Sequence, residues 1–133
     1  MNRTAIIHPS QARTASPTPV PQNNGEGRGV LLVLDVTATP NDAQTLTVAI
    51  QVLDEASGKA VTLTAFTALV ASALGATPTT ATYLFTLLPG AAETIAVAQH
   101  EVQALELPLR WQARVTHSAA GSWTYSLACQ YLA

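Results

Sequence analysis

Alternation of apolar and polar residues is the main structural signal along the chain. Every even position from 46 to 52 is Leu, Val or Ile, and polar or small residues occupy the positions between them. Successive side chains of a strand point to opposite faces of a sheet, so this period of two predicts a strand with one buried face. Residues 107–116 and 123–131 alternate in the same way, and each predicts another half-buried strand.

Three further strands are expected, at residues 29–37, 60–64 and 80–88. The first is an almost unbroken apolar run, which is typical of a strand covered on both faces. The second follows a short polar connection and is expected to pair with residues 45–52 as a hairpin. Six to eight strands at this spacing predict an all-β fold, an antiparallel β-sandwich of the Ig-like or jelly-roll-like kind.

Two segments leave alternatives open. Within residues 65–75, apolar residues fall at helical spacing, and Gly75 is a fitting end for a helix. The same residues can instead continue the strand and then form an irregular crossing, which we favour. Residues 91–104 are small and weakly polar. We expect a connection there, with at most a helical turn at residues 93–97.

The first 28 residues have a different character. Prolines at positions 9, 17, 19 and 21 are followed by a stretch rich in asparagine and glycine. Proline lacks a backbone donor and fixes an extended geometry, and a free tail of this composition is expected to be disordered. We therefore divide the chain into an extended N-terminal arm, residues 1–28, and a β-sandwich domain, residues 29–133. We expect a partner surface to hold the arm.

Charged residues are scarce in this chain. They make up 11% of it, against about 25% in an ordinary soluble domain. A surface so poor in charge favours packing against neighbouring subunits. The arm carries Arg3, Arg13 and Arg28 against Glu26, whereas acidic residues outnumber basic ones in the body. Nucleic-acid binding needs a clustered basic face, so nucleic acid is not expected as a partner.

Residue types capable of catalysis or metal binding are scattered along the chain. His8, His100 and His117 lack the close spacing of metal ligands. The isolated carboxylates, Glu101 among them, are expected to be solvated loop charges. No Gly-x-Ser-x-Gly motif is present. We therefore expect no enzymatic activity, no metal site and no cofactor.

Cysteine and aromatic residues are expected to be structural. Cys129 is the only cysteine, which excludes an intrachain disulfide, and its place in an alternating strand predicts a buried thiol. Trp111, Trp123 and Tyr125 can either stack on sugars, as in a carbohydrate-binding module, or fill the core. The tryptophans share their strand faces with aliphatic residues, so the core is favoured.

Membrane contact is not expected. No apolar run reaches the roughly 18 residues that a spanning helix needs. The apolar stretch at residues 5–7 is too short for the hydrophobic region of a signal peptide.

Short strand and turn motifs run through the body of the chain: Gly29–Thr37, Leu46–Asp54, Ser57-Gly58-Lys59, Leu88-Pro89-Gly90, Leu107–Ser118 and Ser122–Ser126. In these motifs residues 29–133 resemble the small virion structural proteins of tailed bacteriophages, a group that includes β-sandwich head decoration or cement proteins. The resemblance does not extend to the arm.

The resemblance implies a non-enzymatic structural protein, synthesised in the host cytoplasm and located on the capsid surface of the virion. As a capsid decoration or cement protein it would contact the major capsid protein and neighbouring copies of itself, and a homo-oligomer such as a trimer is expected. A neck or tail accessory protein is an alternative. A carbohydrate-binding β-sandwich module is a further one.

The arm is expected to lie along a neighbouring subunit, and strand addition to an exposed sheet edge is one way to do so. Composition selects five arm residues as expected partner contacts: Ile6, Ile7, Arg13, Pro17 and Val20.

Overall fold

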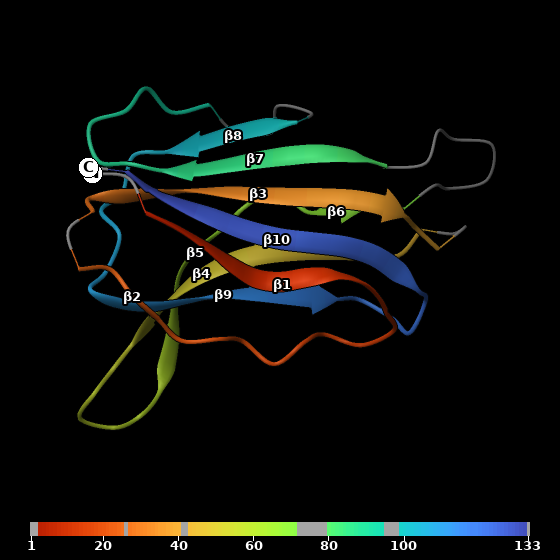
Figure 1. Cartoon of the computed structure of the whole chain (residues 1–133), viewed down its shortest axis with the longest axis horizontal. Helices are drawn as coiled ribbons and strands as arrows, with labels where there is room; N and C mark the ends of the chain where they lie inside the picture. The colour runs from red at the N-terminus through yellow and green to blue at the C-terminus, as the bar shows by residue number, and fades with distance from the viewer. Residues whose placement is uncertain (1–2, 26, 41–42, 72–79, 95–98, 133) are drawn as a thin grey trace.

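The computed structural model describes residues 3–25, 27–40, 43–71, 80–94 and 99–132. All regular structure in these ranges is β-strand, and the strands form two sheets that face each other (Figure 1). The prediction of an all-β sandwich is confirmed. The strands are β1 (Thr4–Arg13), β2 (Gln22–Asn23), β3 (Gly29–Ala38), β4 (Thr45–Leu53), β5 (Ala60–Ala65), β6 (Leu69–Val70), β7 (Ala81–Leu87), β8 (His100–Gln103), β9 (Arg110–His117) and β10 (Trp123–Leu132).

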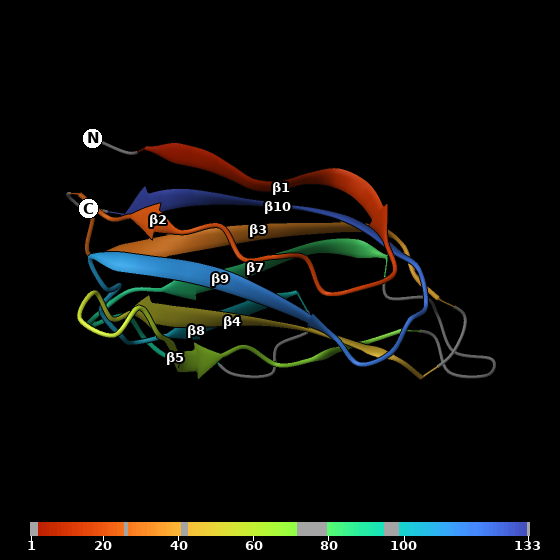
Figure 2. The same cartoon turned by 90° about the horizontal axis from the view of Figure 1, so that it is seen from below.

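The two sheets share the chain in an interleaved order. Sheet A has the strand order β1-β10-β3-β7-β8, and sheet B has the order β2-β9-β4-β5, with β6 also paired to β4. Neighbouring strands are antiparallel except for β7 and β8. Consecutive strands lie in different sheets at six steps, β1–β2, β2–β3, β3–β4, β6–β7, β8–β9 and β9–β10, so the chain ties the two layers together repeatedly (Figure 2).

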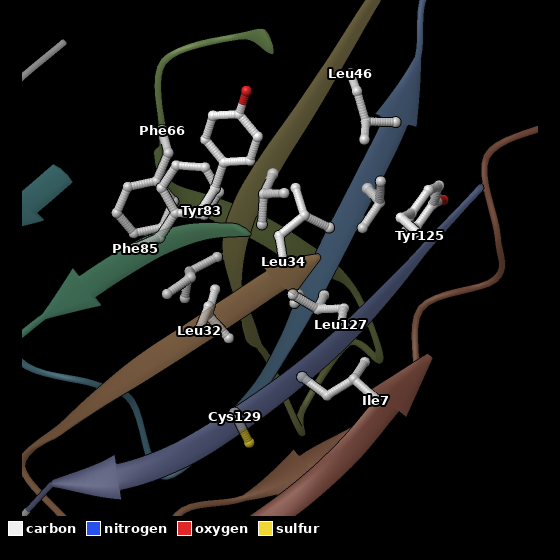
Figure 3. Packing of buried hydrophobic residues seen from close by; sticks show 14 of the residues in the cluster. Ile7, Leu32, Leu34, Leu46, Phe66, Tyr83, Phe85, Tyr125, Leu127 and Cys129 are labelled. Carbon is white, nitrogen blue, oxygen red and sulfur yellow. The ribbon is translucent and has the colours of Figure 1, made fainter. Parts of the chain in front are cut away.

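The core lies between the sheets and is filled by the inward faces of the alternating strands. Trp111, Trp123 and Tyr125 have no exposed surface, which confirms the core interpretation of the aromatic residues. Cys129 is buried beside them, as predicted. Leu34 from β3 and Leu127 from β10 meet in the middle of this layer (Figure 3). The alternating strands thus give an apolar interior to which the inward faces of both sheets contribute.

The N-terminal segment is built into the sandwich, whereas its sequence predicted an extended arm outside the β-sandwich domain. Strand β1 pairs with β10 over its whole length, and Ile7 belongs to the hydrophobic core. Pro9 lies between His8 and Gln11, where the register of the ladder shifts. Proline is tolerated there because β1 is an edge strand whose outer side needs no donor. The division expected at residue 28 therefore does not coincide with a structural boundary.

An extended segment, residues 14–21, connects β1 to β2. Figure 2 shows it turning at the end of β1 and running back along the length of the sandwich. It contains Pro17, Pro19 and Pro21, and most of its residues are exposed. No backbone–backbone hydrogen bond joins it to the rest of the described chain. We call this segment the proline linker.

The two ambiguous segments are resolved in part. Residues 66–71 contain no helix: β6 pairs with β4, and Phe66 stacks on Phe85 with ring centroids 4.8 Å apart. The remaining residues of the helical alternative, including Gly75, lie outside the described residues. The connection expected at 91–104 contains strand β8, which pairs in parallel with β7. The helical turn considered at 93–97 lies largely outside the described residues.

The adjacent residues Ile6 and Ile7 provide a test of how β1 is attached. Ile7 is 4% exposed and Ile6 is 74% exposed. We expect Ile7→Ala to lower the free energy of unfolding by about 2 kcal/mol, the lower end for a buried isoleucine because β1 is at a sheet edge. Ile6→Ala is the matched control, with an expected change of about 0.5 kcal/mol or less. Urea unfolding followed by tryptophan fluorescence measures both, and equal effects of the two variants would contradict the placement of β1.

Candidate functional site

The five residues expected to contact a partner do not form one surface. Ile7 faces the core of its own chain and is therefore unavailable to a partner. Ile6 and Val20 are exposed, whereas Pro17 and Arg13 are half-buried. Because Ile6 and Val20 lie on different segments, on β1 and on the proline linker, the partner surface expected from composition is divided.

Arg13 is used within the chain, where it fastens the end of β1 to β10. Its guanidinium lies over the ring of Tyr125, 4.7 Å from the centroid. Nη1 donates to the carbonyl oxygens of Tyr125 at 2.7 Å and Gln11 at 3.2 Å, and Nη2 donates to that of Pro9 at 2.6 Å. A planar guanidinium provides several fixed donors together with a face for stacking, which a lysine does not.

Arg3 makes an equivalent attachment just before the start of β1. Its guanidinium lies 4.4 Å from the centroid of the Tyr131 ring, and Nη2 donates to the carbonyl oxygen of Asn23. The two arginines therefore hold β1 against β10 at both ends, with Ile7 buried between them. The sequence contained these arginines, but only the strand register shows which tyrosines they meet.

Two histidines with lowered pKa lie close to Arg13. His8 on β1 is 5% exposed, and its pKa is lowered by burial and by the positive charge of Arg13. The pKa of His117 is lowered by the same two causes, and its Nε2 lies 2.9 Å from Tyr125 Oη. Burial raises the pKa of Tyr125 to about 12. The two imidazoles are therefore neutral at pH 7, and the group as a whole carries the single charge of Arg13.

These pKa shifts predict that the fold weakens in mild acid. The unfolded chain takes up protons on histidine near the ordinary pKa of 6.5, above the lowered values of folded His8 and His117. Their stabilising contribution is complete above that pH and is lost as the pH falls from about 6.5 toward the folded-state values.

We therefore expect a lower urea midpoint at about pH 5.5 than at about pH 7.5, a range in which few other side chains titrate. The His8→Gln/His117→Gln double variant should show a smaller difference between the two pH values than the wild type. A wild-type midpoint that stays constant or rises in acid would contradict the assignment.

Glu101 is a buried carboxylate, which corrects its interpretation as a solvated loop charge. It is 2% exposed. Its Oε1 accepts a hydrogen bond from the backbone N–H of Thr67 at 2.8 Å, and its Oε2 accepts one from Gln103 Nε2 at 2.8 Å. Gln103 also accepts from the hydroxyl of Thr64 and donates to the carbonyl of Ala65. This network links β8 of sheet A to β5 of sheet B and gives Glu101 a structural role.

Strand β5 presents an uncharged open edge. It forms the end of sheet B, and among the described strands it pairs only with β4. All of its residues except the half-buried Thr64 are exposed, and Val61 and Leu63 are 55% and 40% exposed. A strand edge carries unpaired backbone N–H and C=O groups, which are a template for another strand.

The loop that precedes β5 is closed by internal hydrogen bonds. Asp54 accepts hydrogen bonds from the backbone of Ala56 at 3.1 Å and from the hydroxyl of Ser57 at 2.6 Å, and the bond from Ser57 is the main cause of its lowered pKa. Gly58 takes a positive φ of 74°, which favours glycine. An exposed ion pair of 3.7 Å joins Glu55 to Arg110 on β9. The hairpin β4–β5 is thereby held in position.

The other edges of the described sheets are better protected than β5. Strand β1 contains Pro9 and two shifts of register, β8 has four residues, and β2 has two. Short strands, prolines and bulges are the usual means of blocking edge-to-edge pairing. Within β5 itself there is no proline and no charged residue. We define the β5 edge as residues 60–65 and take it as the candidate interaction site.

Two negative observations concern the residues that the structure describes. They contain no group of three or more His, Cys, Asp or Glu side chains placed to hold a metal ion. They also contain no helix long and apolar enough to span a membrane.

Comparison with protein-family models, with curated proteins and with solved structures finds no significant match for this chain. The functional argument therefore depends on the surfaces of the molecule itself. The resemblance of residues 29–133 to virion structural proteins stays a prediction.

Proposed function

We propose that this protein is a non-enzymatic structural subunit of a bacteriophage virion, a capsid decoration or cement protein that stabilises the head by packing between its neighbours. The observation that carries the proposal is the exposed, uncharged edge of β5, the least protected edge of the described sheets. The sequence motifs of residues 29–133 supply the virion context. The carbohydrate-binding alternative loses support, because Trp111 and Trp123 are fully buried.

The β5 edge supports binding by strand addition. An incoming strand would pair with outward backbone groups of β5 other than the carbonyl of Ala65, which Gln103 occupies, and Val61 and Leu63 would supply apolar contacts beside that ladder. A hydrogen bond of this kind contributes a net stabilisation of about 1 kcal/mol. A single site therefore binds weakly, but many such sites repeated over a symmetric shell raise the overall affinity through avidity.

Surface composition supports the same proposal. Only 11% of the residues are charged, and the described surface exposes Val61, Leu63, Leu105 and Leu109 in addition to the apolar residues of the N-terminal segment. Such a surface favours contact with other subunits and provides little charge to repel them.

A charge placed on the β5 edge tests the binding mode. We expect Leu63→Lys to leave the free energy of unfolding within about 0.5 kcal/mol of the wild type, because the side chain is exposed. The variant should fail to bind shells in a co-sedimentation assay. Thr116→Lys is the matched control: it adds the same charge at an exposed site on β9, on the other side of β4. Equal binding by the two variants would show that the β5 edge is not the contact.

Cryo-electron microscopy of virions of the phage whose genome encodes this chain tests where the protein lies on the particle. Density for the sandwich repeated over the head, with the β5 edge against a neighbour, is the expected result. Density confined to one vertex or to the tail would replace the head assignment with the neck or tail alternative. Virions without any such density would overturn the proposed function.

A further inference from the structure

We propose that strand β1 is exchanged between copies of this protein, so that β1 of one copy pairs with β10 of the next. The inference rests on the proposed role as an assembly subunit and goes beyond it, because it names a second contact and its occupant, a second copy of this chain. The structure shows the closed arrangement, in which β1 pairs with β10 of its own chain.

The contacts of β1 do not depend on which chain supplies it. Of the strands that the structure describes, β1 pairs with β10 alone. Its main anchors are Ile7 in the core and the guanidinium groups of Arg13 and Arg3 on Tyr125 and Tyr131. A β1 strand from another copy would make the same ladder, the same burial and the same ring contacts. Exchange therefore preserves these contacts, which is the general condition for swapping an element.

The proline linker is loosely attached to the body. Residues 14–21 form no backbone–backbone hydrogen bond within the described chain. Ser16 Oγ accepts one bond from the backbone N–H of His117 at 2.9 Å. An open hollow of about 340 Å³ lies between the residues at the start of β1 and those of strand β2 with the preceding Pro21. Opening the linker would therefore break few interactions.

The sequence of the linker favours an extended path. Three prolines at alternate positions restrict the chain to extended conformations, with about 3.1 Å per residue in the polyproline form. Eight such residues span about 25 Å, which exceeds the roughly 10 Å that separates two packed sheets. In the closed form the chain bends at residues 14–15 to run back along the sandwich. An exchanged linker continues outward instead and reaches a neighbouring copy.

Strand β10 requires an occupant at this edge. Without β1, its outer edge and the rings of Tyr125 and Tyr131 would lose their cover. Each copy that donates its β1 must therefore receive one. A closed ring of copies satisfies this condition, and a trimer is one such ring.

The strand register supplies a direct test. Ala5 lies opposite Cys129 in the β1–β10 ladder. Directly opposed residues of antiparallel strands have Cα atoms about 4.5–5.5 Å apart, a distance that a disulfide bridges. We would mix the double variant Ala5→Cys/Cys129→Ser with the wild-type chain, refold the mixture at high concentration, oxidise it, and separate the products on a non-reducing gel. In this mixture a disulfide between positions 5 and 129 forms only between chains, because each chain carries a thiol at just one of the two positions.

A cross-linked dimer that forms only when the two chains are mixed, and that disappears on reduction, is the expected result and identifies the heterodimer. A second pair, Ala12→Cys in one chain and Thr124→Cys in the other, both in a Cys129→Ser background, tests the opposite end of β1 and covers the case in which the first variant does not fold. Ala12→Cys mixed with Thr62→Cys is the negative control, because β5 lies at the far edge of the other sheet.

The absence of heterodimer, together with an intrachain disulfide in the single variant Ala5→Cys, would overturn strand exchange. That result would leave the proposed function intact, because attachment through the β5 edge is measured separately with Leu63→Lys. Conversely, a heterodimer combined with virions that lack the protein would support exchange and remove the capsid role.

Discussion

Strand β10 is the element on which the rest of the structure depends. It pairs with β3 on one side and with β1 on the other, and its inward face supplies a continuous row of buried residues from Trp123 to Tyr131. Loss of the pairing with β1 or with β3 would expose buried residues of β10 to water. The N-terminus, the centre of sheet A and the aromatic core are therefore stabilised together.

The two long sides of the sandwich are closed by different chemistry. On one side, arginine side chains stack on tyrosine rings and bond to backbone carbonyls. On the other, the buried carboxylate of Glu101 and the amide of Gln103 connect the edge strands of the two sheets. Burying a carboxylate is unfavourable unless it accepts hydrogen bonds, and two are present here. Apart from the bonds of Gln103 to Thr64 and Ala65, no described strand covers the outward edge of β5, which makes this edge the one open to a partner.

The sequence predicted the sandwich and most of its strands because alternation is a local signal. Residues 45–52, 107–116 and 123–131 each carry their own evidence of a buried face. Strand β1 was missed because Pro9 argues against a strand unless the strand is known to lie at an edge, and edge position depends on the whole sheet order. The burial of Glu101 was missed for a similar reason. Its partner Thr67 is 34 residues away, and only the folded chain brings the two together. The β5 strand was expected from its sequence, but its position at the end of the described sheet B was not.

The attachment of β1 has a consequence for how the protein responds to ionic strength. Arg3 and Arg13 are held by ring faces and carbonyl oxygens, and in the described structure neither is paired with a carboxylate. Mobile ions screen an exposed ion pair strongly, but they have little effect on contacts between a guanidinium and a neutral, partly buried group. The N-terminal strand should therefore remain in place in concentrated salt, conditions under which the exposed Glu55–Arg110 pair is weakened.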